Sequence, residues 1–417
     1  MTVALNRGGP TKRPVPVADH AFTRWGLLTH LEHPGQVFAN ITPNWYASIM
    51  GTGIVAVAAA SLPEQFPGLH VAATVIWALA VALLIAVTAA TGLHWLRHRE
   101  TARGHLNDPV MAHFYGAPPM AIVTVGAGAL LLGRHVIGLR AAIDADWVLW
   151  STGTSLGLIV AVAVPYLTFT RPVVRPDSPV EGGPVEGGPV EGGAFGGWLM
   201  PIVAPMVSAS TGALLVPYAP AGQPRLTLLL SCYAMFGISL LASLVVITLI
   251  WGRLAVHKVG PARLVPTLWI VLGPLGQSIT AANLLGGVAH DTLPAPYATG
   301  LEVAGVVYGL PVWGFALLWA AIALAITAST AREGLPFSLT WWSFTFPVGT
   351  CVTGTTALAA HTGSDMFRVA AAVFFGALVA AWLIVAARTV RGSARGWLFL
   401  PAGAASSHVS RDRVQHA

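Results

Sequence analysis

The stretch WWSFTFPVGTCVTGTTALAAH, from Trp341 to His361, is long enough to cross a bilayer and contains no charged residue. It is nevertheless rich in glycines and hydroxyl side chains, and the pair Phe346-Pro347 lies near its start. Hydrocarbon does not solvate polar groups, so a helix facing lipid gains nothing from these residues. The segment is therefore expected to lie inside a helical assembly.

The composition of the chain is that of an integral membrane protein. Of the 417 residues, 55% are hydrophobic and 9% are charged, and the mean hydropathy is +0.70. Soluble globular domains carry about 25% charged residues. The cysteines Cys232 and Cys351 lie far apart within apolar stretches, so neither a disulfide framework nor a zinc site is supported.

Ten runs of predominantly apolar residues predict an all-α polytopic membrane protein with ten transmembrane helices. The runs are Pro43–Leu62, Val71–Leu93, Ala117–Gly133, Trp147–Thr168, Gly197–Val216, Leu226–Trp251, Val265–Gly287, Val303–Thr330, Leu339–Ala360 and Phe367–Ala387. They form a domain of residues 38–387 between an N-terminal tail (1–37) and a C-terminal tail (388–417). The loop 169–196 contains the repeat PVEGGPVEGGPVEGG, which is typical of a flexible linker.

An even number of spans puts both tails on one side of the membrane, and the basic residues identify that side. If the tails are cytoplasmic, all but four of the 22 Lys and Arg residues lie on the cytoplasmic side; the four are Arg134, Arg140, Arg225 and Arg368. This asymmetry follows the positive-inside rule. We therefore expect a multi-pass protein of the plasma membrane with both termini in the cytoplasm. Its basic charge then reflects topology, and nucleic-acid binding is not expected.

Proline and small residues alternate with plain apolar sequence from one span to the next. Every odd-numbered span has proline within it or at its head, and those expected to kink the helices are Pro43, Pro119, Pro205, Pro274 and Pro347. A kink frees backbone groups that hydrocarbon cannot satisfy. In a single span, small residues could merely permit close helix packing. Their regular alternation instead predicts five helical hairpins, with the odd-numbered kinked helices lining a central pore.

The candidate pore-lining residues are glycines, hydroxyls and an amide of these odd spans: Gly51, Thr52, Gly53, Ser208, Ser210, Thr211, Gly276, Gln277, Ser278, Thr350 and Thr353. Hydroxyls and exposed amides can solvate an anion, and the N-terminal ends of half-helices are positive toward it. No acidic or basic residue lies in the interior of an expected span, which argues against a proton pump. The pattern favours an anion channel or facilitated transporter.

Motifs of enzymes, metal sites and cofactor sites are missing from the sequence. It has no phosphate-binding loop, no HExxH and no legible hydrolase triad, so an enzyme is not expected, and neither is a bound metal or cofactor. Seven histidines on the cytoplasmic flanks lack metal-ligand spacing and are expected at the surface: His20, His30, His33, His94, His98, His105 and His113.

Four segments resemble the tellurite-resistance/dicarboxylate transporter family, whose members include malate permeases, sulfite efflux pumps and slow-type anion channels. They are TPNWYASIMGTGIVAVA (Thr42–Ala58), WLMPIVAPMVSASTGALL (Trp198–Leu215), PTLWIVLGPLGQS (Pro266–Ser278) and WWSFTFPVGT (Trp341–Thr350). The resemblance implies ten helices in five hairpins, a central anion pore and a homotrimer in the bilayer. It also implies that a phenylalanine of the ninth helix closes the pore, which places the gate at Phe346, with Phe344 as the alternative.

Four functional hypotheses stay open. LGPLGQS (Leu272–Ser278) is similar to the sulfite efflux branch and favours a passive or weakly coupled conduit for sulfite. Alternatives within the family are a coupled C4-dicarboxylate (malate) carrier, which should show a titratable or basic residue in its path, and an anion channel of the tellurite-resistance type. A noncatalytic membrane scaffold is disfavoured because it needs no kinked polar helices.

The topology can be tested with reporter fusions. Reporters placed after Arg99, Arg175, Lys258 and Arg395 should all be cytoplasmic, and those after Arg140 and His290 should lie outside. A cytoplasmic signal at Arg140 would contradict the ten-span arrangement.

Overall fold

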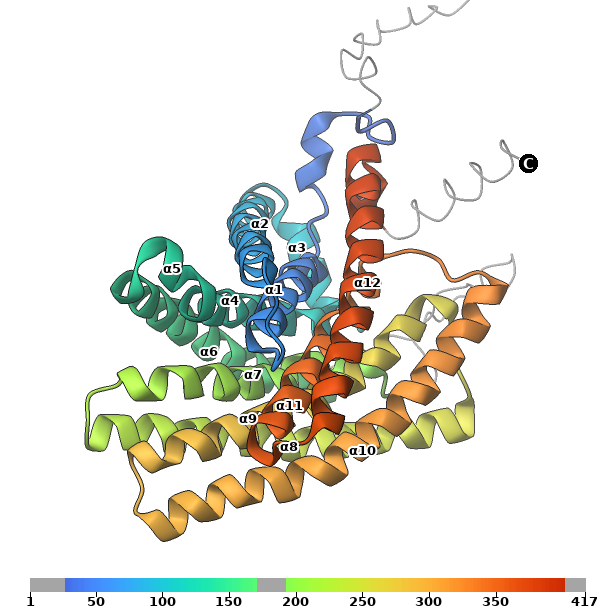
Figure 1. Ribbon diagram of the computed structural model, residues 1–417. Coiled ribbons are helices and arrows are strands. Elements are labelled where there is room, and N and C mark those ends of the chain that lie inside the picture. The colour runs from blue at the N-terminus through green and yellow to red at the C-terminus, as the bar shows by residue number, and fades with distance from the viewer. Residues whose placement is uncertain (1–26, 171–192, 402–417) are drawn as a thin grey trace, which may run out of the picture.

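The computed structural model describes residues 27–170 and 193–401 (Figure 1). The first 26 residues of the predicted N-terminal tail and nearly all of the PVEGG repeat lie outside these ranges. Every predicted span is helical, and no strand occurs among the described residues. The predicted all-α fold is confirmed.

Each odd-numbered span folds as a short α-helix introduced by a 3₁₀ segment. The pairs are η3 (Pro43–Trp45) with α1 (Tyr46–Ser61), η4 (Met111–Gly116) with α4 (Ala117–Gly128), η6 (Gly196–Trp198) with α7 (Leu199–Leu215), η8 (Ala262–Val271) with α9 (Leu272–Val288), and η10 (Leu339–Phe344) with α11 (Phe346–Thr362). A π-helical segment, η5 (Ala129–Gly133), continues α4.

The even-numbered spans fold as longer helices. They are α2 (Leu69–Arg97), α6 (Leu139–Thr170), α8 (Gln223–His257), α10 (Ala295–Glu333) and α12 (Asp365–Arg395), and the connecting helices α3 (Arg99–Asn107) and α5 (Arg134–Ile137) are short. Among the described residues, eight helical stretches are long and apolar enough to cross a membrane. Helices α1 and α11, with 16 and 17 residues, are not among them. The number of ten crossings therefore stays a prediction.

The helices form five hairpins around an inner ring, as the alternating sequence pattern predicts. The hairpins pair α1 with α2, α4 with α6, α7 with α8, α9 with α10, and α11 with α12. The first helix of each hairpin also contacts its counterparts, so that α1, α4, α7, α9 and α11 close a ring (Figure 1). In the apolar part of Gly196–Tyr218, 94% of the residues are buried inside the protein, against 17% in Leu69–Arg97. The outer helices therefore leave their apolar surface for lipid.

The predicted kink prolines mostly mark helix starts rather than bends. Pro43 begins η3, and Pro119, Pro274 and Pro347 lie in the first turns of α4, α9 and α11. Residues of a first turn have no intrahelical acceptor for their amides, so proline breaks no hydrogen bond there. Of the five, Pro205 alone lies in the interior of its α-helix, α7. The other four stand at or near the start of a helix, so any bend they cause lies close to the junction of the 3₁₀ and α-helical segments.

The two described ends of the chain pack against each other. The backbone amide of Leu28 donates to the carbonyl of Ala394, and the Asn40 side chain donates to the carbonyl of Leu400. The ring of Phe399 stacks on Trp45 at a centroid distance of 5.3 Å. These contacts place both ends on the same side of the helical assembly.

A close backbone contact in the ring joins α9 to α11. A Cβ added at Gly276 would overlap the backbone of Thr350 and Cys351. At Gly314, on the outer helix α10, an added Cβ would meet nothing. The absence of a side chain at Gly276 therefore sets how closely the two inner helices approach.

Substituting alanine at these two glycines should have opposite effects on stability. Gly276→Ala should lower the free energy of unfolding by about 1–3 kcal/mol, because two backbones must separate. Gly314→Ala should leave it unchanged or raise it, since alanine favours a helix. Thermal unfolding of both purified variants checks this, and equal melting temperatures would show that the α9–α11 contact tolerates a methyl group.

Candidate functional site

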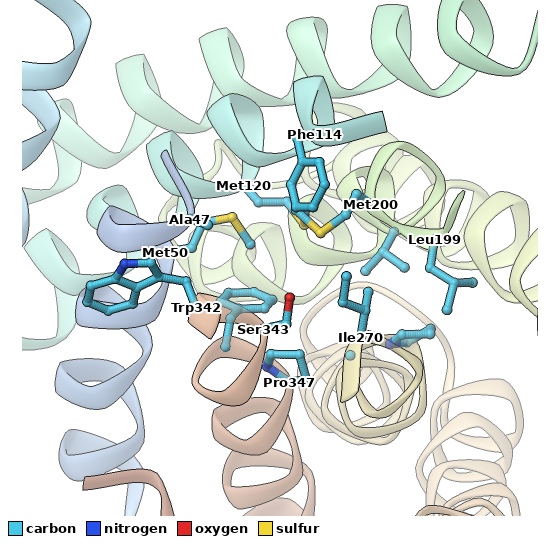
Figure 2. A pocket seen from close by; sticks show the side chains of 14 residues that line it. Ala47, Met50, Phe114, Met120, Leu199, Met200, Ile270, Trp342, Ser343 and Pro347 are labelled. Atoms are coloured by element: carbon cyan, nitrogen blue, oxygen red, sulfur yellow. The ribbon is translucent and has the colours of Figure 1, made fainter. Parts of the chain in front are cut away.

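A small cavity lies where the five inner helices begin (Figure 2). Each inner helix or its 3₁₀ segment contributes to the lining, with Met50, Met120, Met200, Ile270 and Phe346 among its side chains. Apart from Ser343, the lining side chains are apolar or aromatic, and Figure 2 shows those of several helices converging.

Most of the residues that line this cavity belong to helix N-terminal turns. Leu199 and Phe346 are the first residues of α7 and α11, Ala47 is the second of α1, and Pro274 is the third of α9. The N-terminal end of a helix carries a partial positive charge from its aligned peptide dipoles. Five such ends around one cavity give it a positive potential without any ionised side chain. An anion is the solute that this arrangement favours.

Phe346 forms part of the cavity wall. Its side chain is 5% exposed and lines the cavity together with the neighbouring Pro347. The chain changes from 3₁₀ to α-helix at Thr345, whose hydroxyl donates to the carbonyl of Trp342 at 2.7 Å. This buried transition fixes where the first residue of α11, Phe346, projects.

A chain of polar side chains joins three inner helices. The Gln277 amide on α9 donates to the hydroxyl of Ser210 on α7. One turn along α9, the hydroxyl of Thr280 lies 2.8 Å from that of Thr353 on α11. All four residues are buried. Of the predicted pore residues, Ser210, Gln277 and Thr353 are thus brought together by the structure.

The predicted residues of the first span do not join this group. The hydroxyl of Thr52 accepts a hydrogen bond from the Trp382 indole of the outer helix α12. Side chains added at Gly51 and Gly53 would overlap Thr345 and Thr124, respectively. These three residues pack helices against one another, and their place in a pore wall stays a prediction.

The remaining predicted pore residues are likewise engaged in helix contacts. Thr350 is fully buried, and its hydroxyl lies 2.7 Å from the carbonyl of Pro347 and 3.2 Å from that of Leu272. Gly276 is the close-packing glycine of the α9–α11 contact. Ser278 and Thr211 donate to carbonyls of their own helices, and the carbonyl of Ser208 accepts from the Trp150 indole. These hydrogen bonds show local packing.

Thr280 and the methionines of the cavity belong to the site but are not among the pore residues predicted from the sequence. Thr280 closes the polar chain, and Met50, Met120 and Met200 line the cavity. Thr280 follows Gln277 by three residues, so helical periodicity could have indicated that both face the same way. A methionine in a membrane helix gives no comparable signal, because it suits lipid, core and cavity equally.

One acidic residue contradicts the expectation of uncharged span interiors. Helix α6 begins at Leu139, so Asp146 lies two turns inside it, fully buried. Neither carboxyl oxygen has a hydrogen-bond partner among the described residues. The side chain lies against Gly126 of α4, where an added Cβ would overlap it. The carboxyl group faces the α4–α6 contact and does not line the cavity.

The expectation of surface histidines fails at two positions. His94 is 1% exposed and His113 is 4% exposed. Their Nδ1 atoms bond to the carbonyls of Phe38 and Pro109, respectively. Among the described residues, no group of three or more histidine, cysteine or acidic side chains is arranged to hold a metal ion.

Comparison with known proteins assigns the family. Residues 40–390 match the model of the voltage-dependent anion channel family. The chain belongs to this family. The resemblance predicted from the four sequence motifs is confirmed, and the protein is a multi-pass membrane protein of an anion transporter family.

Several curated relatives match nearly the whole chain. A sulfite efflux pump of Arthroderma otae is 30% identical over 367 residues, which cover 87% of this chain and 93% of the relative. A sulfite efflux pump of Trichophyton rubrum is 29% identical with the same coverage. An uncharacterized transporter of Methanocaldococcus jannaschii is 26% identical over 328 residues, or 78% of this chain and 86% of the relative.

Proposed function

We propose that this protein exports small oxyanions, sulfite foremost, through a pore along the axis of its inner helices. The observation that carries the proposal is the convergence of five helix N-terminal ends on one cavity. The sulfite efflux pumps among its relatives, up to 30% identical, favour sulfite over other small anions.

The proposed pathway matches the needs of a conducted anion. Dipole ends attract the ion into the cavity, and hydroxyl and amide groups such as Thr280 and Gln277 can replace part of its hydration shell. No ionised side chain lines the cavity, so binding stays weak enough for release. Such a pathway performs transport and needs no catalytic group or cofactor.

The proposed gate is Phe346. Phe346 lines the apolar cavity, and Thr353 of the polar chain follows it by two turns along α11. A hydrophobic constriction closes a pore by excluding water. In this proposal, rotation of the ring opens the way from the cavity toward Thr353. We also propose that the protein works as a homotrimer in the plasma membrane, with both termini in the cytoplasm.

Asp146 is the one observation that favours the coupled carrier. A carrier driven by protons needs a titratable group, and buried carboxyl groups in membranes often serve this role. Asp146, however, faces Gly126 at the α4–α6 contact, away from the cavity. A group outside the pathway has no direct means of coupling a proton to the anion. The passive or weakly coupled conduit therefore remains the better proposal.

Replacing Phe346 by alanine should open the pore. We expect Phe346→Ala to give markedly higher sulfite flux in proteoliposomes than the wild type, because the ring no longer excludes water. Phe344→Ala is the matched control, since the Phe344 ring packs edge-on against Trp269 and Trp341 at 5.6 Å. Its flux should stay near that of the wild type. If the alanine at residue 346 instead costs about 3–5 kcal/mol of stability, as for a core phenylalanine, without raising flux, the gate assignment is wrong.

A flux panel should separate conduit from coupled carrier. Sulfite, malate, nitrate and chloride uptake into proteoliposomes is measured with and without a pH gradient, for the wild type and for Asp146→Asn. We expect sulfite to give the highest flux of the four anions. The flux through both proteins should not depend on the pH gradient when the protonation state of sulfite is kept the same. Preference for malate together with a gradient effect that Asp146→Asn abolishes would establish the dicarboxylate carrier instead.

A further inference from the structure

An arginine near the end of α8 is largely buried, and its Nε atom has no partner among the described residues. Arg253 lies two residues beyond the predicted span Leu226–Trp251, but α8 continues to His257, and Arg253 is 8% exposed. It takes part in no ion pair and no hydrogen bond with any described residue. Arg225, at the opposite end of the same helix, donates to the carbonyls of Ala219 and Pro217.

An unpaired buried cation is unfavourable. Removing a charge from water costs several kcal/mol unless an opposite charge or hydrogen-bond acceptors replace the water. Arginine keeps its proton under all physiological conditions, so it does not escape this cost by becoming neutral. An anion bound at the largely buried guanidinium of Arg253 would therefore be stabilised.

Arg253 lines a second, small cavity. The cavity lies between the end of α8, the following turn at Val259–Pro261, Phe195 beside η6, and the start of η8. Gly260 keeps the wall open beside the guanidinium, because an added Cβ would lie 3.2 Å from Nη1. Among the described residues that line this cavity none is acidic, and Arg253 is the charged one.

The same segments border the two cavities. Leu264, Val265, Thr267 and Leu268 of η8 line the cavity beside Arg253. Ile270 and Gly273, a few residues further along, line the cavity that contains Phe346 in its wall. On the other wall, Phe195 lines the second cavity and Leu199, four residues later, lines the first. The same two segments therefore border both cavities, on the side where the inner helices begin.

We propose that Arg253 is the loading site for the transported oxyanion at the entrance of the pathway. A guanidinium can donate two parallel hydrogen bonds to two oxygens of one oxyanion, a geometry that suits sulfite and that lysine does not reproduce. The bound anion supplies the missing countercharge. When it is released toward the gate, it enters the first cavity, which binds it more weakly. The identity of the anion as transported substrate rests on the proposed function, whereas the existence of the oxyanion site does not.

Binding is tested by thermal unfolding of the purified protein with increasing sodium sulfite at constant ionic strength. Sulfite should raise the melting temperature of the wild type, since a ligand of the folded state stabilises it. Arg253→Met should abolish this rise, while its melting temperature without sulfite stays equal to or above that of the wild type. Lys258→Gln removes an exposed cation five residues away and should retain the rise. A low melting temperature of Arg253→Met without sulfite, combined with an unchanged rise, would show that Arg253 is structural and overturn the proposal.

The source of the anion is distinguished by two further arms. The first repeats the melting measurement in vesicles with and without anionic phospholipid. If anionic lipid raises the melting temperature in place of sulfite, a headgroup phosphate is the partner and the loading role is wrong. The second replaces the linker glutamates Glu181, Glu186 and Glu191 by glutamine. The sulfite response should persist in that background, and its disappearance would overturn the proposal.

Flux measurements separate this inference from the proposed function. Arg253→Lys should raise the sulfite concentration that gives half-maximal flux by about tenfold, the loss of one charge-assisted hydrogen bond, with little change in maximal flux. An unchanged half-maximal concentration would refute the loading role. If the wild type binds sulfite through Arg253 but conducts none, the oxyanion site stands and the proposed transport function fails.

Discussion

The rest of the structure depends on one constraint: hydrocarbon offers no partner to an exposed backbone amide or carbonyl. Each inner helix interrupts the regular α-helical hydrogen bonding at the same place, where a 3₁₀ segment becomes an α-helix near a proline. Such junctions are stable only inside protein, and the five outer helices surround them with protein. The close backbone contact at Gly276 and the burial of Thr345 follow from the same need, because both keep lipid away from irregular backbone.

The same constraint creates the electrostatics of the site. The five inner helices begin beside one another, so their dipoles do not cancel as they would in an antiparallel bundle. The antiparallel partners lie in the outer layer, further from the axis. The cavity consequently gains positive potential from backbone alone. A fixed ionised side chain there would hold an anion more tightly and slow its release.

The sequence predicted the architecture better than the site, for a physical reason. Alternation of proline-bearing and plain spans reports which helices avoid lipid, so the inner and outer sets were predictable. It does not report which way a small or hydroxylated residue faces within a buried helix. Thr52 and Thr353 look alike in sequence, yet one bonds to an outer helix and the other to the polar chain. Helix ends were the other source of error, since Asp146 and Arg253 fell just outside the apolar runs although their helices extend beyond them.

The two buried charges that the hydropathy pattern excluded differ in what surrounds them. Asp146 lies against a glycine in a helix contact and lines neither of the two cavities described above, and a proton would relieve the cost of its burial. Arg253 keeps its charge, and it lines a cavity of its own. Burial alone therefore does not identify a binding site in this membrane protein. A buried charge becomes a site when the group remains ionised and space for its partner is present.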